Sequence, residues 1–437
     1  MGAFFQKEIE TMPRRQLQEL QLENLKWAVK HCYENIKFYH DRLDAAGVTP
    51  EKIKTLSDLQ YIPFTTKADI RDQYPFGLFA VPMRQIVRLH ASSGTTGKPT
   101  VVGYTRKDLD TWSDLVARIL VAGGATQDDI NISFGYGLFT GALGLHGGLE
   151  KLGATVVPSS SGNTQKQLML MKDFGVTALI ATPSYAMYMA ETAQELGYKK
   201  EDFSLRLAFL GSEGCTPELR EKIEEAWGIF VTDNYGMSEL MGPGVSGECE
   251  YRQGLHFAED HFIPEIIDPD TLQQKAPGET GELVITTITK EGFPMLRYRT
   301  KDITRLNYEP CPCGRTHVRM DKVKGRSDDM LKIRGVNVFP SRSKRAHAHS
   351  ADQAPAISWC CAGKLYGCLQ VNELNDASLL ERYAELEKLQ NTVHNQLKTV
   401  LGIESKVLLV EPKSLERFAG KAKRIVDLRE EKEEPKK

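Results

Sequence analysis

A loop near residue 95 has the composition of a phosphate-binding segment. Two glycines let backbone N–H groups turn toward an anion, hydroxyls add neutral donors, and one lysine adds a positive charge. We therefore predict that this loop binds the phosphates of a nucleotide, with a polar surface hairpin as the alternative. Its residues are Ser92, Ser93, Gly94, Thr95, Thr96, Gly97 and Lys98.

The loop is not a Walker loop. A Walker loop needs glycine where this chain has Ser92, and a helix directly after the lysine. Here Pro99 is followed by the run 101–105, Val-Val-Gly-Tyr-Thr, and an apolar run at 86–89 precedes the loop. The sequence therefore predicts strand, loop, strand.

A second segment, residues 233–239, places a carboxylate after an aromatic residue and a glycine turn. It contains Asn234, Tyr235 and Glu239. Carboxylate oxygens are suited to Mg²⁺, which is commonly shared with bound phosphates. We predict that Glu239 binds magnesium, and a solvated turn carrying one glutamate is the alternative.

The elements that must position these segments follow from hydrophobic periodicity. Helical spacing over 15–46 predicts one or two amphipathic helices. From about 100 to 290, short apolar runs alternate with helical stretches such as 218–227, which is typical of an α/β protein with largely parallel sheets. Strands are expected at 155–157, 178–180, 207–210 and 282–285.

Composition restricts the class of protein. The 437 residues exceed the size at which one core usually stops growing, so two or more domains are expected. A net charge of -2 disfavours nucleic acid as a partner, and no apolar run approaches the ~18–20 residues of a membrane span. Since Met1 to Glu8 lacks a signal pattern, we expect a cytoplasmic protein.

The order of the motifs resembles that of the adenylate-forming superfamily of acyl-coenzyme A synthetases, adenylation domains and luciferases. The compact length and the opening segment from Arg14 to Gly47 are similar to the phenylacetate-coenzyme A ligases within it. The resemblance spans nearly the whole chain. The motifs that carry it are at 92–100, 235–239, 297–302, 325–335 and 420–424.

The resemblance implies an α/β fold in two domains. Residues 1–325 would form a large N-terminal domain, with mixed, largely parallel sheets, that binds ATP and an acid. Residues 326–437 would form a small, mobile α+β domain that carries the catalytic Lys421 and is joined by a hinge at Asp328. Such enzymes are AMP-forming acid–thiol ligases: the acid attacks the α-phosphate of ATP, pyrophosphate leaves, and coenzyme A takes the acyl group.

The resemblance also implies roles for single residues. Lys421 would offset negative charge that develops in the transition state, and Glu239 would hold the magnesium ion. An acid beside an arginine would bind the ribose hydroxyls, and a short polar segment would lie near the adenine. These four residues are Asp302, Arg326, Asn234 and Tyr235. For Asp302 the alternative is an ordinary surface ion pair.

Residues 134–141 form an aromatic, glycine-rich stretch that resembles the family's pocket for aryl acids. Tyr136 and Phe139 are the expected walls, because aromatic rings pack well on a flat substrate, and Gly141 would let the substrate ring approach the backbone. Gly211 is also assigned to the pocket. Three residues later, Gly214 stands where the family commonly has proline. A core segment with glycine packing is the alternative.

The cysteines suggest a separate metal site. Eight cysteines are too few for a disulfide scaffold, and clustered cysteines inside a cell more often bind metal than pair. We predict a structural zinc site of the Cys3His type, with free thiols as the alternative and His261 and His317 as rival ligands. Its four residues are Cys249, His256, Cys311 and Cys313.

Residues 341–368 do not fit the resemblance. The family pattern predicts a helix and then a strand there, and both apolar patterns are absent until about Leu369. Our hypothesis is a stretch translated in a shifted frame that leaves the C-terminal domain with a poor core. The alternatives are a genuine variant hairpin and a second metal cluster formed by His347, His349, Cys360 and Cys361.

We predict an enzyme that activates an aryl carboxylic acid, with phenylacetate as the best candidate, and makes its coenzyme A thioester. Its partners would be the acid, ATP with Mg²⁺ and coenzyme A, with no nucleic acid and no membrane, and a homodimer is one option for its assembly. One alternative is an adenylating enzyme that passes the acyl group to a carrier protein. Another is a nucleotide-binding protein impaired by a damaged small domain.

Overall fold

The computed structural model divides the chain into two units, Met1–Asp328 and Asp329–Lys437. The described part of the first unit is nearly continuous, whereas the second is described mainly through its strands. The described residues are 3–92, 99–133, 135–159, 163–327, 331–333, 336–338, 357–361, 368–373, 390–392, 394–395, 405–410 and 425–427.

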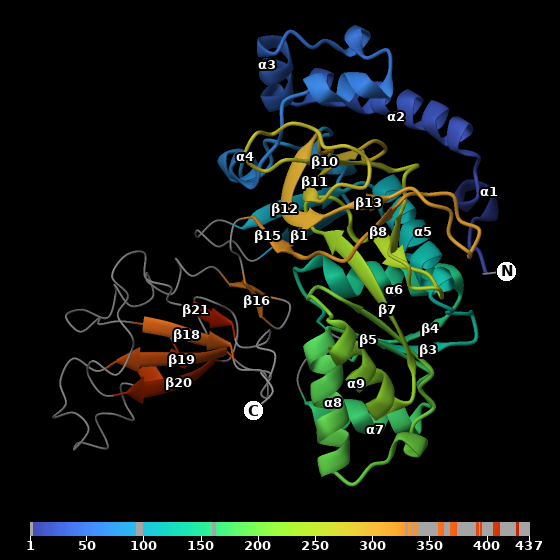
Figure 1. Cartoon of the computed structure of the whole chain (residues 1–437), viewed down its shortest axis with the longest axis vertical. Helices are drawn as coiled ribbons and strands as arrows, with labels where there is room; N and C mark the ends of the chain where they lie inside the picture. Colours follow the sequence, from blue (N-terminus) through green and yellow to red (C-terminus); the bar gives the residue numbers. More distant parts are fainter. Residues whose placement is uncertain are drawn as a thin grey trace, which may run out of the picture. The chain divides into compact units, whose positions relative to one another are not determined.

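The N-terminal segment is helical, as the spacing over 15–46 predicts. It forms α1 (Lys7–Glu10), α2 (Arg14–Asn35) and α3 (Lys37–Ala45). One stripe of α2 is buried, and Figure 1 shows this helix along the edge of the unit beyond β10 and β11. Short elements follow: η1 (Pro50–Lys52), η2 (Leu56–Tyr61), α4 (Lys67–Asp72) and η3 (Met83–Gln85).

A hairpin carries the predicted phosphate loop. Strands β1 (Arg88–Ser92) and β2 (Thr100–Tyr104) pair antiparallel, and Ser92 lies opposite Thr100. The predicted order of strand, loop, strand is therefore confirmed. The loop residues 93–98 themselves lie outside the described residues.

A nine-stranded mixed sheet forms the centre of the first unit, in the order β13-β14-β9-β8-β7-β6-β5-β3-β4. The strands from β3 to β7 pair parallel, because helices connect them, and the strands from β8 onward pair antiparallel. All four strands predicted at 155–285 form, although the last belongs to a second sheet. The bounds are β3 (Ile130–Ser133), β4 (Thr155–Val157), β5 (Ala178–Ala181), β6 (Leu207–Gly211), β7 (Phe230–Met237), β8 (Gly242–Glu248), β9 (Leu255–Phe257), β13 (Leu306–Asn307) and β14 (Arg319–Met320).

Alternate residues of the parallel strands enter two different cores. In β6, Leu207 and Phe209 belong to the core shared with α5 and α6, whereas Ala208 and Leu210 belong to the core shared with α7, α8 and α9. Successive strand residues point to opposite faces, so both faces of the sheet must be covered by helices. Figure 1 shows α7, α8 and α9 gathered at one end. The helices are α5 (Arg106–Ala122), α6 (Thr140–Leu152), α7 (Thr164–Asp173), α8 (Pro183–Glu195), η4 (Lys200–Asp202) and α9 (Pro217–Trp227).

An antiparallel sheet of four strands completes the first unit, in the order β10-β11-β12-β15. Its last pair places Asp302 directly opposite Arg326. The strands are β10 (Phe262–Ile267), β11 (Gly281–Thr287), β12 (Tyr298–Thr304) and β15 (Gly325–Arg326).

The second unit contains a two-stranded pair, β16 (Leu331–Ile333) and β17 (Val336–Val338), and a four-stranded sheet in the order β20-β19-β18-β21. The sheet's strands are β18 (Ile357–Cys361), β19 (Cys368–Glu373), β20 (Ser405–Val410) and β21 (Ile425–Asp427). The two-domain α/β fold is thus confirmed. Within the anomalous segment 341–368 the structure has β18, which pairs antiparallel with β19 and parallel with β21, as in the alternative of a genuine variant hairpin.

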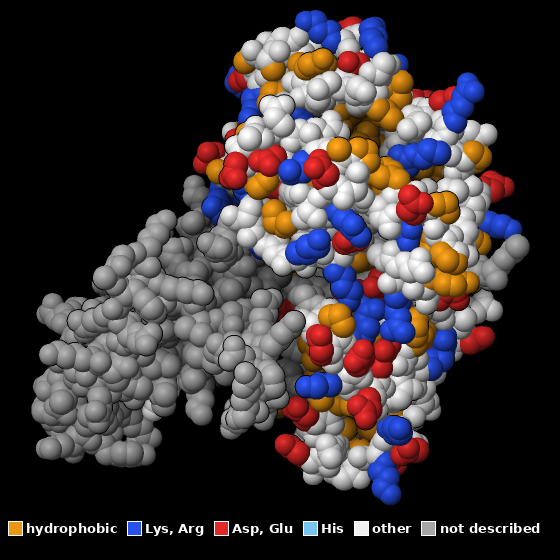
Figure 2. All heavy atoms as spheres, viewed as in Figure 1, with side chains coloured by type: hydrophobic (Ala, Val, Ile, Leu, Met, Phe, Trp, Pro, Cys, Tyr) orange, Lys and Arg blue, Asp and Glu red, His pale blue; other side chains and the backbone are white. Residues whose placement is uncertain are grey.

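The described surface carries charges of both signs. Figure 2 shows Lys and Arg side chains interspersed with Asp and Glu over the visible face. Among the described residues, no helix has the length and apolar character that crossing a membrane requires.

The turn from β7 to β8 depends on Gly236. A Cβ atom added to Gly236 would lie 1.9 Å from the carbonyl oxygen of Gly242, and backbone cannot yield as a side chain can. We expect Gly236→Ala to lower the free energy of unfolding by roughly 1–3 kcal/mol, the usual cost of overpacking. Urea titration measures this. Gly214→Ala, where the added Cβ meets nothing within 4 Å, is the control. Equal effects of the two substitutions would contradict the argument.

Candidate functional site

The predicted residues gather where β6 and β7 end. Gly211 is the last residue of β6, and it pairs with Asn234 in β7. In parallel sheets the carboxyl ends of the strands form the usual ligand-binding edge. The Asn234 Nδ2 donates a hydrogen bond to the carbonyl of Leu210 at 2.7 Å, and a Cβ on Gly211 would lie 2.9 Å from the Asn234 Oδ1. Glycine at 211 therefore leaves room for the Asn234 side chain.

Asp302 connects the four-stranded sheet to the nine-stranded sheet of the first unit. Its Oδ2 accepts a hydrogen bond from the Tyr235 hydroxyl at 2.7 Å, and its Oδ1 accepts one from the Arg326 guanidinium at 2.8 Å. The Asp302 residue is only 1% exposed. A buried carboxylate needs such partners, because an unpaired charge in the interior is very costly. Asp302 therefore does not form the surface ion pair with Lys301 or Arg299 that was the alternative. Both of those residues pair with Glu282 instead.

Glu239 lies directly after β7 and is 4% exposed. Lys67 at the start of α4 approaches it, with the Lys67 Nζ 3.3 Å from the Glu239 Oε1. Burial raises the pKa of the Glu239 carboxyl, but the charges of Lys67 and Arg326 and a backbone hydrogen bond outweigh burial, so the pKa lies below its ordinary value. Among the described residues, none gives Oε1 a hydrogen bond. Glu239 is therefore ionised, and the Lys67 ammonium is the positive charge that faces its Oε1.

Lys290 supports the backbone next to Glu239. Its side chain is buried, its Nζ donates to the carbonyl of Leu240, and the same Nζ lies 4.6 Å from the centre of the Tyr104 ring. Burial lowers the pKa of Lys290 to about 8, although the charges of Asp108 and Glu239 oppose the shift. Sequence reasoning found neither Lys290 nor Lys67. Each is a single lysine without a motif, and its partner is distant in the chain.

The predicted aryl-pocket stretch, residues 134–141, follows β3 in the chain, and its residue Leu138 contacts β1. Ala91 in β1 donates a backbone hydrogen bond to the carbonyl of Leu138 at 2.9 Å, so β1 and this stretch are neighbours. The Tyr136 hydroxyl bonds to the Nδ1 of His146 in α6 at 2.8 Å. Phe139 is 41% exposed, and a Cβ on Gly141 would lie 3.0 Å from its ring. The stretch therefore offers an exposed ring supported by the start of α6.

Some predicted residues cannot be placed. Residues 93–98 of the predicted phosphate loop, the predicted hinge residue Asp328 and the predicted catalytic residue Lys421 lie outside the described residues. Ser92 is described: it is buried, and its Oγ has no hydrogen-bond partner among the described residues. The four predicted zinc ligands do come together, at the other end of β8 from Glu239.

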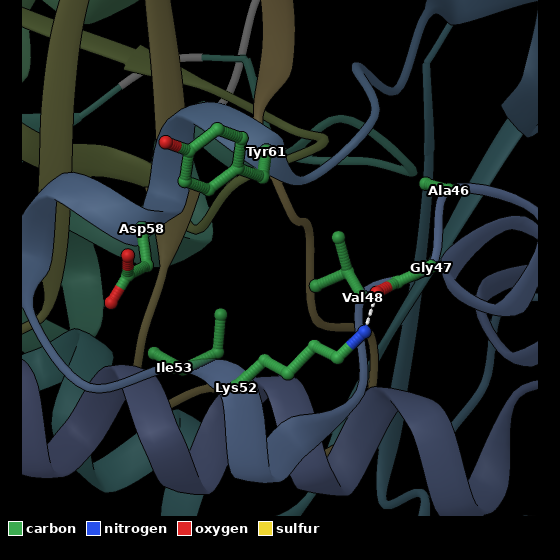
Figure 3. Close-up of a pocket in the computed structure, with 7 residues that line it drawn as sticks. All are labelled: Ala46, Gly47, Val48, Lys52, Ile53, Asp58 and Tyr61. Atoms are coloured by element: carbon green, nitrogen blue, oxygen red, sulfur yellow. Dashed lines mark hydrogen bonds between the residues drawn. The ribbon is translucent and has the colours of Figure 1, made fainter.

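A pocket of about 240 Å³ lies elsewhere, between α3 and η2 (Figure 3). Its lining includes Val48, Ile53 and Tyr61, and the Lys52 Nζ is held by the carbonyl of Gly47. None of the predicted site residues lines this pocket. It is therefore not the predicted nucleotide site.

Asp233 starts the polar segment of β7 within a buried charge network. Its backbone N–H donates to the Glu248 Oε2 at 2.8 Å, the Arg220 Nη2 donates to the same oxygen at 2.6 Å, and the Lys322 Nζ lies 3.6 Å from the Asp233 Oδ2. Burial raises the pKa of Asp233 to about 7; Glu248 adds to the shift, and Lys322 and Arg220 oppose it.

Family models match both units of the chain. Residues 20–289 match the model described as "AMP-binding enzyme", and residues 366–429 match the model described as "AMP-binding enzyme C-terminal domain". The second match begins near the end of the anomalous segment 341–368.

Curated relatives are similar along the whole chain. A phenylacetate-coenzyme A ligase of Thermus thermophilus is 46% identical, covering 97% of this chain and 99% of its own length. One of Escherichia coli is 47% identical, covering 96% and 97%. Among solved structures, a 2-hydroxyisobutyryl-CoA ligase in complex with 2-HIB-AMP and CoA has a TM-score of 0.89 and 29% identity, covering 97% of this chain and 92% of that one.

The buried network predicts a pH dependence for Asp233→Asn. The folded pKa of about 7 exceeds the ordinary value of 3.8, so the folded state holds a proton that the unfolded state has lost between these pH values. This group's contribution to stability is complete below pH 3.8 and is lost as the pH rises through 7. The stability of Asp233→Asn relative to wild type should therefore rise by roughly 1–4 kcal/mol from about pH 5 to about pH 8.

Denaturant titration at several pH values measures the difference. Asp128→Asn, which changes an exposed acid, is the control. A pH-independent difference between wild type and Asp233→Asn would show that Asp233 is ionised throughout.

Proposed function

Because the chain belongs to the AMP-binding enzymes and, within them, to the phenylacetate-coenzyme A ligases, it activates an acid with ATP and transfers the acyl group to coenzyme A, and we propose that its acid is phenylacetate. In the first step a carboxylate oxygen bonds to the α-phosphorus of ATP, and pyrophosphate leaves. In the second the coenzyme A thiol attacks the acyl carbon, loses its proton, and AMP leaves. The placement of Glu239 and Asp302 around the ends of β7 and β12 carries the assignment of the ATP site.

Asp302 is assigned to the ribose of ATP. An ionised carboxylate accepts through about four lone-pair sites, and Tyr235 and Arg326 use one on each oxygen. Both oxygens therefore keep capacity for a pair of vicinal hydroxyls. Asn234, the neighbour of Tyr235 in β7, is assigned to the adenine side, and Gly211, which pairs with Asn234, is assigned to the pocket for the acid.

Glu239 is assigned to magnesium. Its carboxylate is buried and ionised, and its Oε1 faces the Lys67 Nζ at 3.3 Å, where a hard cation that prefers oxygen would replace the lysine as counter-ion. When bound, the ion would neutralise charge on the phosphate oxygens. When no ion is bound, Lys67 balances the negative charge of Glu239. Residues 92–98 are assigned to the phosphates that leave.

The aryl ring of the acid is assigned to the 136–141 stretch. Phe139 presents an exposed ring, and the Tyr136 side chain is fixed by His146. This stretch contacts β1 through Ala91 and Leu138, so the acid would lie next to the phosphate loop. The predicted mobile domain, residues 326–437, is assigned to the second unit, Asp329–Lys437, with Lys421 in it and a hinge at Asp328, whereas Arg326 lies in β15 of the first unit. The frame-shift hypothesis for 341–368, the homodimer and the cytoplasmic location stay predictions.

The proposal is tested with a panel of acids. Pyrophosphate release and thioester formation are measured with phenylacetate, benzoate, coumarate, an indole acid and 2-hydroxyisobutyrate, with and without coenzyme A. We expect release with phenylacetate and a phenylacetyl thioester when coenzyme A is present. Preference for 2-hydroxyisobutyrate would overturn the aryl assignment. Release without a coenzyme A thioester would indicate another acceptor, and ATP binding without release would indicate an impaired binding protein.

Lys421→Ala should slow pyrophosphate release by roughly 100-fold or more, the usual loss when one stabilising charge leaves a transition state. Thioester formation from a supplied acyl-adenylate should be nearly unchanged, because Lys421 is assigned to the first step. Lys423→Ala, which removes a neighbouring positive charge, is the control. Equal slowing of both steps would contradict this role.

Asp302→Asn should raise the Kd for ATP by roughly 10- to 100-fold, since bonds to a charged group are worth about 1.5–3 kcal/mol. Binding of phenylacetate should change little. Calorimetry with each ligand measures both. The control is Asp321→Asn, which alters an acid paired with Arg305 at the surface. A normal Kd for ATP would remove Asp302 from the nucleotide site.

A further inference from the structure

Four metal-ligating side chains converge at the end of β8 that is remote from Glu239. Cys249 directly follows β8, His256 lies in β9, and Cys311 and Cys313 lie in the loop between β13 and β14. Their ligand atoms all lie within 4.8 Å of one another, and all four residues are buried. The three segments are far apart in sequence, so the tertiary fold alone brings them together.

The spacing of the donor atoms fits one tetrahedral ion. Zinc–sulfur bonds of about 2.3 Å and zinc–nitrogen bonds of about 2.0–2.1 Å give tetrahedron edges of about 3.8 Å between sulfurs and about 3.6 Å between sulfur and nitrogen. The Cys249 and Cys311 sulfurs are 3.7 Å apart, and the Cys313 Sγ is 3.4 Å from the His256 Nε2. A disulfide is excluded at this separation, since its S–S bond is about 2.05 Å.

Neighbouring groups orient the donors. The Nδ1 of His256 faces the carbonyl of His317 at 3.4 Å, which suits a proton on Nδ1 and leaves the Nε2 lone pair directed at the sulfurs. The Arg315 N–H lies 3.5 Å from the Cys313 Sγ and donates to it. Ala122 closes the cluster with an apolar side chain.

The rival histidines are occupied elsewhere. His317 uses its Nδ1 on the carbonyl of Phe257 at 2.9 Å and its Nε2 on the carbonyl of Ile9 at 3.0 Å. His261 bonds to Thr289 and pairs with Asp260. The choice among the three histidines, which the sequence left open, therefore falls on His256.

We propose that Cys249, His256, Cys311 and Cys313 bind one Zn²⁺ ion in a closed structural site. Thiolate and imidazole donors favour zinc over Mg²⁺ or Ca²⁺, which prefer oxygen. Four protein ligands leave no position for a substrate, so the ion has no role in the acid activation. Each cysteine that binds as thiolate releases its proton to solvent.

The site would also anchor the N-terminal segment. The loop that carries Cys311 and Cys313 continues to Arg315, whose Nε donates to the Glu10 Oε2 at 2.7 Å, and to His317, which bonds to Ile9. Both residues of that pair, Arg315 and Glu10, are buried. Zinc would thus tie α1 to the end of β8 through this loop.

The first test is the metal content of the full-length protein purified without a metal-affinity tag or a chelator. Inductively coupled plasma mass spectrometry should find about one zinc per chain. The Cys311→Ser/Cys313→Ser variant should lose it, and Cys215→Ser, which changes another buried free cysteine, should keep it. Zinc in wild type no higher than in the double variant would overturn the proposal.

Two further readouts do not require the double variant to fold. Cobalt exchanged into the wild-type protein should show the charge-transfer absorption of a cysteinate complex, and its absence would overturn thiolate binding. A strong chelator should lower the Tm of wild type and speed proteolysis between α1 and α2 severalfold; no change in either would overturn the anchoring role. Since zinc content does not depend on turnover, these results are separate from the fate of the proposed acid specificity.

Discussion

The buried carboxylate of Asp302 is the constraint around which the nucleotide side of the first unit is arranged. An ionised group that is 1% exposed must be paired, and its partners come from two sheets: Tyr235 from β7 and Arg326 from β15. The hydrogen bond from Tyr235 to Asp302 fixes the position of β12 against the end of β7. The pairing of Asp302 with Arg326 also places an arginine whose charge reaches Glu239. The same bonds that satisfy the interior therefore bring together the two acids assigned to ATP.

Three cationic side chains lie around Glu239, and one of them, Arg326, also pairs with Asp302. Lys67 pairs with Glu239, Arg326 acts on Glu239 from β15, and Lys290 holds the carbonyl of the next residue. Lys290 is stabilised partly by the ring of Tyr104, a cation–π contact in a desolvated setting. Cations held in this way are suited to the phosphates of ATP, because the approaching anion meets charges already in place.

Strand β8 connects this region to the cysteine cluster. Its close contact with α5 depends on small residues: a Cβ on Gly247 would lie 2.4 Å from the Ile119 side chain. The approach that β8 makes to α5 also brings Cys249 beside Ala122 at the end of that helix. The close approach of Gly236 to Gly242 and the cluster at Cys249 thus lie at the two ends of β8.

The sequence by itself determined the strand–loop–strand at 88–104, the helices over 15–46 and the βα alternation, because these depend on local composition and periodicity. The order of its motifs, through the resemblance to a known family, singled out Glu239 and Asp302 as the acids of the predicted site. Only the tertiary structure decided that Lys67 pairs with Glu239, that His256 rather than His261 or His317 faces the cysteines, and that β18 forms. Each of these depends on partners far apart in the chain. The residues next to a lysine, a histidine or a weak strand do not indicate which distant group will pair with the charge, accept the lone pair or hydrogen-bond the backbone.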